Sequence, residues 1–439
     1  MKKALVLSGG GTRGSYQNGV MRALCRIQKN RFDIITGTSI GALNGALAVQ
    51  SDYRAMDDLW HNLSQDQIIN SPISMDIDLM TLMNERSQII PFVRNYFEEK
   101  GADNRPLIEG IRRLYNPEKF FASKTDFGCI AARYRTREGV MVTKEMMREH
   151  GADWLISSAS AWPVFPVHRF EEGDFIDGGY YDNLPVDFAL QLGAEEIIAV
   201  DLRNVPQHPN YMDCPGITYI YPKVTADMFL SFDRSYLNML ETAGYYDAMK
   251  ACGVFDGVKY TFEHRRLPDW NGSFRRDILM LETRITRAGE INEKLRSAQL
   301  ITDALLAVQH KKILSEKEFF YGMADYILDL LSGDIGHVYT YREFRKLVTE
   351  RFDACRSESY TYRPGMNMSQ LHAFVSSLDR PGRIGHIVHA VYYPDHRIVS
   401  DNALLTMYPF EAAAALFIIY ILEEKEAGRI WKDAQSLKK

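Results

Sequence analysis

Residues 33–46 read DIITGTSIGALNGA, and they decide the fold prediction because a strand-like run leads there directly into a helix-like one. Residues 32–36 have the apolar and β-branched character of a strand, and residues 40–49 are rich in alanine and leucine, which favour a helix. Ser39 lies between the two segments in a G-x-S-x-G pattern, which is typical of a nucleophile elbow. We therefore predict a sharp turn that presents the Ser39 hydroxyl beyond the end of a sheet.

Gly37 and Gly41 stand two residues on either side of this serine. In such an elbow, side chains at these positions would collide across the strained turn, so glycine is expected there. The backbone N–H of Ile40, at the start of the helix, would lie where it could donate to an oxyanion. The alternative is a serine that only caps the helix, which is a common role for serine at this position.

A second glycine-rich turn follows the first expected strand. Residues 3–7 (KALVL) form a short apolar strand, residues 8–14 read SGGGTRG, and a helical pattern begins after them. Consecutive backbone N–H groups that no Cβ atom obstructs can bind an oxyanion together. The candidate oxyanion-hole residues in this loop are Gly9, Gly10, Gly11, Thr12, Arg13 and Gly14. Gly10, Gly11 and Thr12 are the favoured donors.

The same loop supports other interpretations. It also spells G-x-G-x-x-G, and Asp33 follows at about the spacing of a dinucleotide-binding fingerprint. In that fold the acidic residue ends the second strand, whereas Asp33 begins its strand, so nucleotide binding is disfavoured. Arg13 would either add a positive charge to the site or pin the loop by pairing with a carboxylate, and both roles stay open.

Beyond the elbow, strand-like and helix-like segments alternate over much of the first half of the chain. Strands are expected near residues 127–136, 140–146 and 195–202, and helices near residues 154–158 and 184–193. This alternation indicates a mainly parallel α/β sheet that helices cover on both faces. Residues 52–105 are irregular, and we expect an insertion of short helices over the end of the sheet.

An activated serine needs a base, and the histidines do not supply an obvious one. A Ser-His-Asp triad would place a histidine after an acid, late in the α/β region. Four of the eleven histidines fall in that region, and none stands at a glycine-rich strand end: His61, His150, His168 and His208. His168, within FPVHRF, is expected on the surface of a strand.

Asp177 does stand at such a strand end. It lies in FEEGDFIDGGYYDNLPVD, residues 170–187, where Gly178 and Gly179 leave room for another chain segment to approach. Partial burial raises the basicity of a carboxylate, so a serine-aspartate dyad is chemically feasible. The alternative is a turn aspartate that only makes an Asx turn.

Four motifs, in this order and at these separations, resemble the patatin-like phospholipase family. They are GGGTRG at residues 9–14, GTSIG at 37–41, SSASAWPVFP at 157–166 and DGGYYDNLP at 177–185. The resemblance covers roughly the first 200 residues. It implies a three-layer α/β/α sandwich with a mainly parallel central sheet, and hydrolysis of acyl esters by a serine-aspartate dyad without a histidine or a cofactor.

Carried over by motif, the resemblance makes Ser39 the nucleophile, Asp177 the base and the loop from Gly9 to Gly14 the oxyanion hole. Residues 157–166 would shape the site beside the dyad. The expected substrate is a phospholipid, a lysophospholipid or another fatty-acyl ester. The competing hypothesis is a non-catalytic or regulatory binding module that keeps the fold.

The strand-like alternation fades after about residue 262, so we expect a catalytic domain over residues 1–270 and a mainly helical domain of unknown role over residues 271–439. The apolar run at residues 409–422 (PFEAAAALFIIYIL) is shorter than a spanning helix needs and contains Glu411. It is expected to form a buried helix or a subunit contact. Aromatic residues such as Phe319, Phe320 and Tyr321 would fill a helical core, line an acyl channel or form a dimer contact.

The bulk properties restrict the partners and the compartment. The 439 residues are 46% hydrophobic and 25% charged, which is ordinary globular composition, and the formal net charge of -5 disfavours nucleic acid. Five scattered cysteines and the lack of a signal-peptide pattern suit reduced thiols in the cytoplasm, and no paired-histidine spacing suggests a metal. A transient membrane-surface contact and a homo-oligomer stay open.

Overall fold

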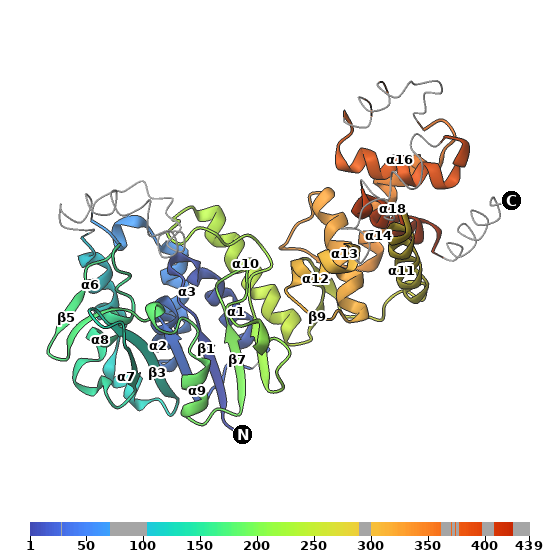
Figure 1. The fold of residues 1–439 in the computed structure, drawn as a ribbon. Helices are drawn as coiled ribbons and strands as arrows, with labels where there is room; N and C mark the ends of the chain where they lie inside the picture. Colours follow the sequence, from blue (N-terminus) through green and yellow to red (C-terminus); the bar gives the residue numbers. More distant parts are fainter. Residues whose placement is uncertain are drawn as a thin grey trace. The chain divides into compact units, whose positions relative to one another are not determined.

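The structure is a computed structural model that describes residues 1–27, 29–70, 103–288, 300–360, 370, 374, 377–396 and 408–424. The chain divides into two compact units, Met1–Gly253 and Val254–Lys439, and each is described by itself (Figure 1). The sequence predicted two domains with separate roles that meet near residue 270. The compact units do not test these roles, so that division stays a prediction.

The first unit is built on an eight-stranded, mostly parallel sheet. Its strands are β1 (Lys3–Leu7), β2 (Ile34–Thr38), β3 (Asp126–Arg133), β4 (Gly139–Thr143), β5 (His168–Phe170), β6 (Gly173–Asp177), β7 (Glu196–Val200) and β8 (Ile217–Ile220). β3, β2, β1, β7 and β8 are neighbours in that order and run parallel, whereas β4, β5 and β6 pair antiparallel. The expected strands are present, and β2 extends two residues beyond its predicted end.

Helices cover both faces of this sheet, as Figure 1 shows for the first unit. They are α1 (Gly14–Arg26), α2 (Ile40–Val49), α3 (Tyr53–Asn62), α6 (Arg105–Leu114), α7 (Pro117–Ala122), α8 (Met147–Ser158), α9 (Val186–Gln191) and α10 (Arg234–Ala251). Because side chains alternate along a strand, Leu7 faces α2 while Val6 packs with α9 on the other face. The three-layer α/β/α prediction is confirmed.

The pairing of β3 brings two strand ends together. β2 lies along one edge of β3 and ends where Thr38 is opposite Ile130. The next residue of β3, Ala131, pairs with Asp177 at the end of β6, and its other edge is occupied by Val140 of β4. β6 therefore pairs with the same edge of β3 as β2, beginning one residue beyond the point where β2 ends. Because β6 runs antiparallel to β3, the carboxyl ends of β2 and β6 lie next to each other.

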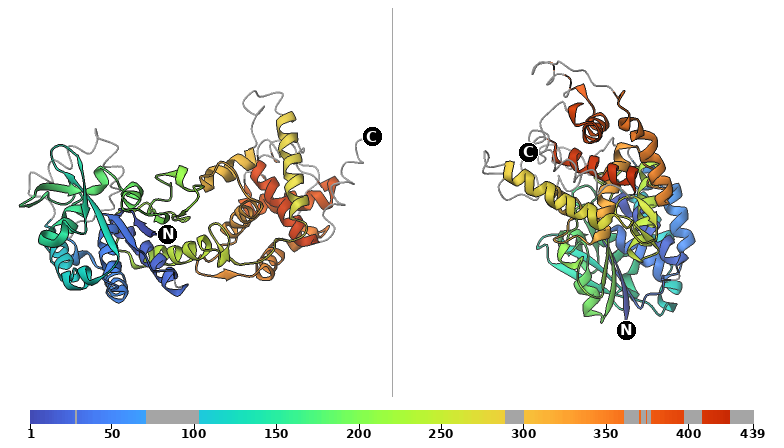
Figure 2. Two further views of the ribbon diagram at one scale, coloured as in Figure 1. Left: turned by 90° about the horizontal axis from the view of Figure 1, so that it is seen from below. Right: turned by 90° about the vertical axis from the view of Figure 1, so that its right-hand side faces the viewer.

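Two helices that are far apart in the sequence pack closely in this unit. α10 lies against α1, and Figure 2 gives two further views of this arrangement. A Cβ atom on Gly19 would lie 1.9 Å from the backbone oxygen of Glu241, and one on Gly244 would lie 2.1 Å from that of Tyr16. The two glycines thus let the helix backbones touch. The sequence analysis did not predict α10.

The second unit is mainly helical, as predicted. Its helices are α11 (Asn271–Ala288), α12 (Leu300–Gln309), α13 (Glu316–Leu330), α14 (Tyr341–Phe352), α16 (Arg380–Tyr392) and α18 (Pro409–Glu423), beside a small sheet of β9 (Phe255–Asp256), β10 (Thr261–Glu263) and β11 (Val338–Tyr339). α18 is buried among the other helices, so the apolar run at residues 409–422 forms a core helix. Within the described ranges, no helix combines the length and the apolarity needed to cross a bilayer.

Candidate active site

Ser39 occupies a sharp turn between β2 and α2. Its backbone has φ 55° and ψ −126°, a left-handed conformation that is costly for a residue with a side chain. A Cβ atom on Gly37 would lie 2.4 Å from the backbone oxygen of Gly41, and one on Gly41 would lie 2.3 Å from that of Leu7. The turn is therefore possible only with glycine on both sides, as the G-x-S-x-G pattern predicts.

A second serine holds this strained turn in place. The backbone N–H of Ser39 donates a 2.9 Å hydrogen bond to Oγ of Ser158, which is fully buried at the end of α8. Ser158 lies within residues 157–166, the segment expected to shape the site. Its specific contact was not predicted, because no local pattern links positions 119 residues apart.

Asp177 ends β6 beside the elbow and is 7% exposed. Its Oδ1 accepts a 2.7 Å hydrogen bond from the N–H of Gly179, and its own N–H donates to the carbonyl of Ser160. Burial raises the pKa of Asp177 to about 6, although hydrogen bonding from the Ser39 hydroxyl and the Gly179 N–H favours the charged form. The carboxylate is thus a stronger base than an exposed aspartate.

The glycine loop supplies only some of the N–H groups that the sequence analysis considered. The N–H of Gly9 donates to the carbonyl of Asn183, that of Thr12 to the carbonyl of Phe229, and that of Arg13 to Gly10. The Gly14 N–H bonds within the loop. Of the candidate donors, the N–H groups of three residues have no acceptor within the described part of the chain: Gly10, Gly11 and Ile40.

Arg13 pins the loop by hydrogen bonds to backbone carbonyl groups. Its side chain is buried, Nε donates to the carbonyl of Gly10 at 3.1 Å, and Nη1 donates to the carbonyl of Ala226 at 3.1 Å. Gly11 has φ 60°, and a Cβ atom there would lie 2.3 Å from the backbone oxygen of Phe229. The loop is therefore held against residues 226–229, a segment that the sequence analysis did not connect with the site.

Asn183 links the glycine loop to the loop that follows Asp177. Its backbone oxygen accepts from the N–H of Gly9, and its Nδ2 donates to the carbonyl of Gly9 at 3.2 Å and to Oε1 of Gln207 at 3.0 Å. Gln207 in turn donates to the fully buried carboxylate of Asp201. A continuous hydrogen-bonded chain thus ties both loops to the end of β7.

The histidines of the α/β unit have partners of their own. Nε2 of His168 lies 3.0 Å from Oδ1 of Asp153, and Nε2 of His150 lies 3.5 Å from a carboxylate oxygen of Glu171. Burial lowers the pKa of His168, against the opposing effect of Asp153. Within the ranges that the structure describes, no histidine lines the cavities beside Ser39.

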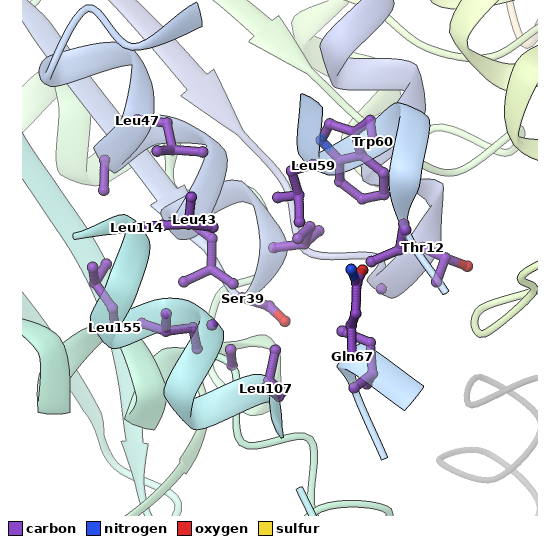
Figure 3. Close-up of a pocket in the computed structure, with 18 of the residues that line it drawn as sticks. Thr12, Ser39, Leu43, Leu47, Leu59, Trp60, Gln67, Leu107, Leu114 and Leu155 are labelled. Atoms are coloured by element: carbon purple, nitrogen blue, oxygen red, sulfur yellow. The ribbon is translucent and has the colours of Figure 1, made fainter. Parts of the chain in front are cut away.

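Two cavities meet at Ser39. The larger has a volume of about 380 Å³ and is lined mostly by apolar side chains of α2, α3 and α6. In Figure 3 the Ser39 hydroxyl faces this space, with Leu43, Leu47 and Leu114 on one side and Thr12 and Gln67 on the other. The smaller, of about 40 Å³, is more polar and includes Asp177, Asn183 and Arg203 among its lining residues. Ser39 therefore separates an apolar compartment from a polar one.

The cavity wall tests two further expectations. α3 covers the Ser39 side of the sheet, so the expected insertion of short helices is confirmed there, while residues 71–102 lie outside the described residues. Asp33 accepts a hydrogen bond from the N–H of Lys3 at the opposite end of the strands from the glycine loop. This separation argues against dinucleotide binding.

Comparison with known proteins agrees with this arrangement. Residues 5–190 match the family described as "Patatin-like phospholipase". The chain is 33% identical over 224 residues to rat "Patatin-like phospholipase domain-containing protein 7" and 30% identical over 214 residues to "Lysophospholipase NTE1" of Candida albicans. Each match covers 48% of this chain but only 14% of the relative, so this chain corresponds to a small part of these proteins.

A similar chain of known structure is VipD from Legionella pneumophila. It is 14% identical in sequence, with a TM-score of 0.38, and the alignment covers 96% of this chain and 91% of that one.

Proposed function

We propose, since the chain belongs to the patatin-like phospholipase family through residues 5–190, that it hydrolyses fatty-acyl esters of lipids by way of an acyl-enzyme at Ser39. Phospholipids, lysophospholipids and other long-chain esters are the substrate class. The observation that carries the proposal is a buried carboxylate with a pKa of about 6 next to a serine at the mouth of a 380 Å³ apolar cavity. A reducing compartment such as the cytoplasm suits the five free cysteines.

The first half-reaction forms the acyl-enzyme. Asp177 accepts the proton of the Ser39 hydroxyl as Oγ attacks the acyl carbonyl carbon, and the carbonyl oxygen becomes an oxyanion. The unpaired N–H groups of Gly10, Gly11 and Ile40 are the donors that would stabilise this oxyanion. When the C–O bond breaks, Asp177 returns the proton to the leaving alkoxide, and the alcohol departs.

The second half-reaction restores the enzyme. A water molecule gives its proton to Asp177 and attacks the ester carbon of the acyl-Ser39, and the same N–H groups would bind the oxyanion. Collapse of this intermediate releases the fatty acid and returns the proton from Asp177 to Ser39 Oγ. The strained elbow, which Ser158 and the two glycines hold, keeps Oγ at the junction of the two cavities throughout.

A fluorophosphonate, which phosphonylates activated serines, tests the proposal directly. Wild-type protein should be labelled at Ser39, and Ser39→Ala should not be labelled. Ser157→Ala is a matched control, because its Oγ is buried and makes no hydrogen bond to a described residue, so labelling should persist. Hydrolysis of a panel of lipid esters by wild type, and not by Ser39→Ala, would then identify the substrate.

The competing hypothesis predicts a different result. If a folded wild-type protein binds lipid but is not labelled at Ser39 and hydrolyses no ester in the panel, the chain is a binding module that keeps the fold. Labelling of a serine other than Ser39 would refute the assignment of the nucleophile.

A further inference from the structure

The large cavity follows one helix away from Ser39. Its lining includes Leu43 and Leu47 of α2 and Gln50 directly after this helix, at increasing distance from the elbow. At about 1.5 Å per residue, the stretch of α2 from Ser39 to Gln50 is roughly 16 Å long. An apolar cavity of about 150 Å³ accommodates the six carbons of benzene, so by the same measure a volume of about 380 Å³ has room for roughly 15 carbons. The cavity thus fits one long acyl chain.

α6 forms the opposite wall of this cavity. Leu107, Gly110, Ile111 and Leu114 all line it, and their spacing places them on neighbouring rows of one helix face. In Figure 3 Leu107 lies close to Ser39, whereas Leu114 lies near Leu43. Gly110 therefore stands part of the way along the path from the serine to the far end of the cavity.

Gly110 differs from the other α6 residues of this wall because it has no side chain to fill the cavity beside it. Among the residues that the structure describes, no atom lies within 4 Å of the position that a Cβ atom on Gly110 would take. Glycine is unfavourable inside a helix, and no described residue packs against Gly110 closely enough to require one. Its effect on the cavity is to widen the wall at mid-length.

From this arrangement we propose that Gly110 determines the length of the acyl chain that the site accepts. The inference rests on the proposed function, because it assigns the cavity to the acyl chain of the ester bound at Ser39. A larger side chain at position 110 would obstruct the cavity beyond its first part. Short chains would still reach from Ser39 to the obstruction, and long chains would be excluded.

The variants are Gly110→Leu and, as a smaller step, Gly110→Ala. Gly272→Leu is the matched control, because Gly272 lies in the first turn of α11, is exposed and does not line the cavity. Its Cβ position also has no atom of a described residue within 4 Å. All three replacements favour a helix, so a general effect on stability is shared. Circular dichroism and thermal unfolding verify that each full-length variant is folded.

Two measurements separate this inference from the proposed function. The first is equilibrium binding of palmitate and octanoate, followed by displacement of a fluorescent fatty acid, which requires no turnover. Gly110→Leu should weaken palmitate binding relative to octanoate by about tenfold or more, because a pocket that lacks room for a methylene discriminates by at least that factor. Gly110→Ala should show a smaller change in the same direction, and Gly272→Leu none.

The second measurement is hydrolysis of p-nitrophenyl butyrate and palmitate. Gly110→Leu should lower kcat/KM for the palmitate ester by about tenfold or more relative to kcat/KM for the butyrate ester. An unaltered chain-length profile in both measurements would overturn the role of Gly110. Loss of selective palmitate binding without hydrolysis of any ester by wild type would support that role and overturn the proposed reaction instead.

Discussion

At the scale of single residues, the strained backbone of Ser39 costs folding free energy, and its proposed role as nucleophile would explain why the strain is kept. A non-glycine residue in a sparsely populated conformation such as φ 55° and ψ −126° costs on the order of 1–3 kcal/mol. Ser39→Gly should therefore raise the free energy of unfolding by about 1 kcal/mol after the entropy of glycine in the unfolded chain is counted. Ser39→Ala keeps a Cβ atom and should give no such increase.

Both variants lose the hydroxyl and should lose fluorophosphonate labelling. Urea denaturation of wild type, Ser39→Gly and Ser39→Ala measures the difference in stability. If the two variants were equally stable, the elbow would not store the strain that its dihedral angles indicate.

The buried carboxylate of Asp177 gives a second prediction at this scale. Its pKa is raised by burial to about 6, and only the unprotonated form accepts a proton from Ser39. We expect kcat/KM to be constant above this pH and to fall by about tenfold per pH unit below it. Asp177→Asn should lower turnover by roughly two to four orders of magnitude.

The pH dependence of kcat/KM for a soluble ester measures the first effect, and steady-state kinetics measures the second. His168→Gln and His150→Gln are the controls, because both histidines lie beside carboxylates that do not line the cavities. Near-normal turnover in Asp177→Asn, together with an inactive histidine variant, would instead indicate a triad.

At the scale of elements, the site depends on contacts between loops that follow different strands. Asn183 binds Gly9 through its backbone oxygen and its amide nitrogen, so it positions the glycine loop relative to the loop after Asp177. Asn183→Ala should lower kcat by about tenfold or more with a smaller change in KM, because it disturbs the oxyanion donors and leaves the acyl cavity intact.

Gln207→Ala gives a graded test of this chain of hydrogen bonds. This variant keeps Asn183 but removes the Gln207 side chain that orients the Asn183 amide. We therefore expect kcat to fall by a smaller factor than in Asn183→Ala. A rise in KM at unchanged kcat in either variant would show that Asn183 contributes to substrate binding and does not position the loop.

The comparison of sequence and structure is clearest at this scale. Local pattern was sufficient for β1, β2 and α2, because strand periodicity, glycine positions and helix propensity all act within about ten residues. It was also sufficient to single out Ser39 and Asp177, since each stands at a glycine-rich strand end. Their roles as nucleophile and base stay predictions.

Local pattern could not decide which N–H groups of the glycine loop are available. The N–H of Thr12 donates to the carbonyl of Phe229, which is 217 positions away in the sequence. No property of the loop sequence indicates this contact. The large apolar cavity was missed for the same reason, because its walls come from α2, α3 and α6 together. Such features follow from tertiary packing and require coordinates.

At the scale of the whole molecule, every described residue that lines the cavities beside Ser39 belongs to the unit Met1–Gly253. α10 is joined to other helices of this unit by hydrogen bonds. The Tyr16 hydroxyl of α1 donates to Asp247, and Arg234 donates to the carbonyl of Trp60 in α3. A chain cut after Gly253 therefore keeps the sheet, both cavities and the helix that covers α1.

The last prediction follows from this division. A fragment of residues 1–253 should be folded and should be labelled by a fluorophosphonate at Ser39, whereas a fragment of residues 1–233 should not fold, because it lacks α10 and exposes the face of α1 that α10 covers. Circular dichroism with thermal unfolding measures folding, and mass spectrometry locates the label. If the longer fragment unfolded cooperatively but its Ser39 did not react, residues 254–439 would contribute to the chemistry.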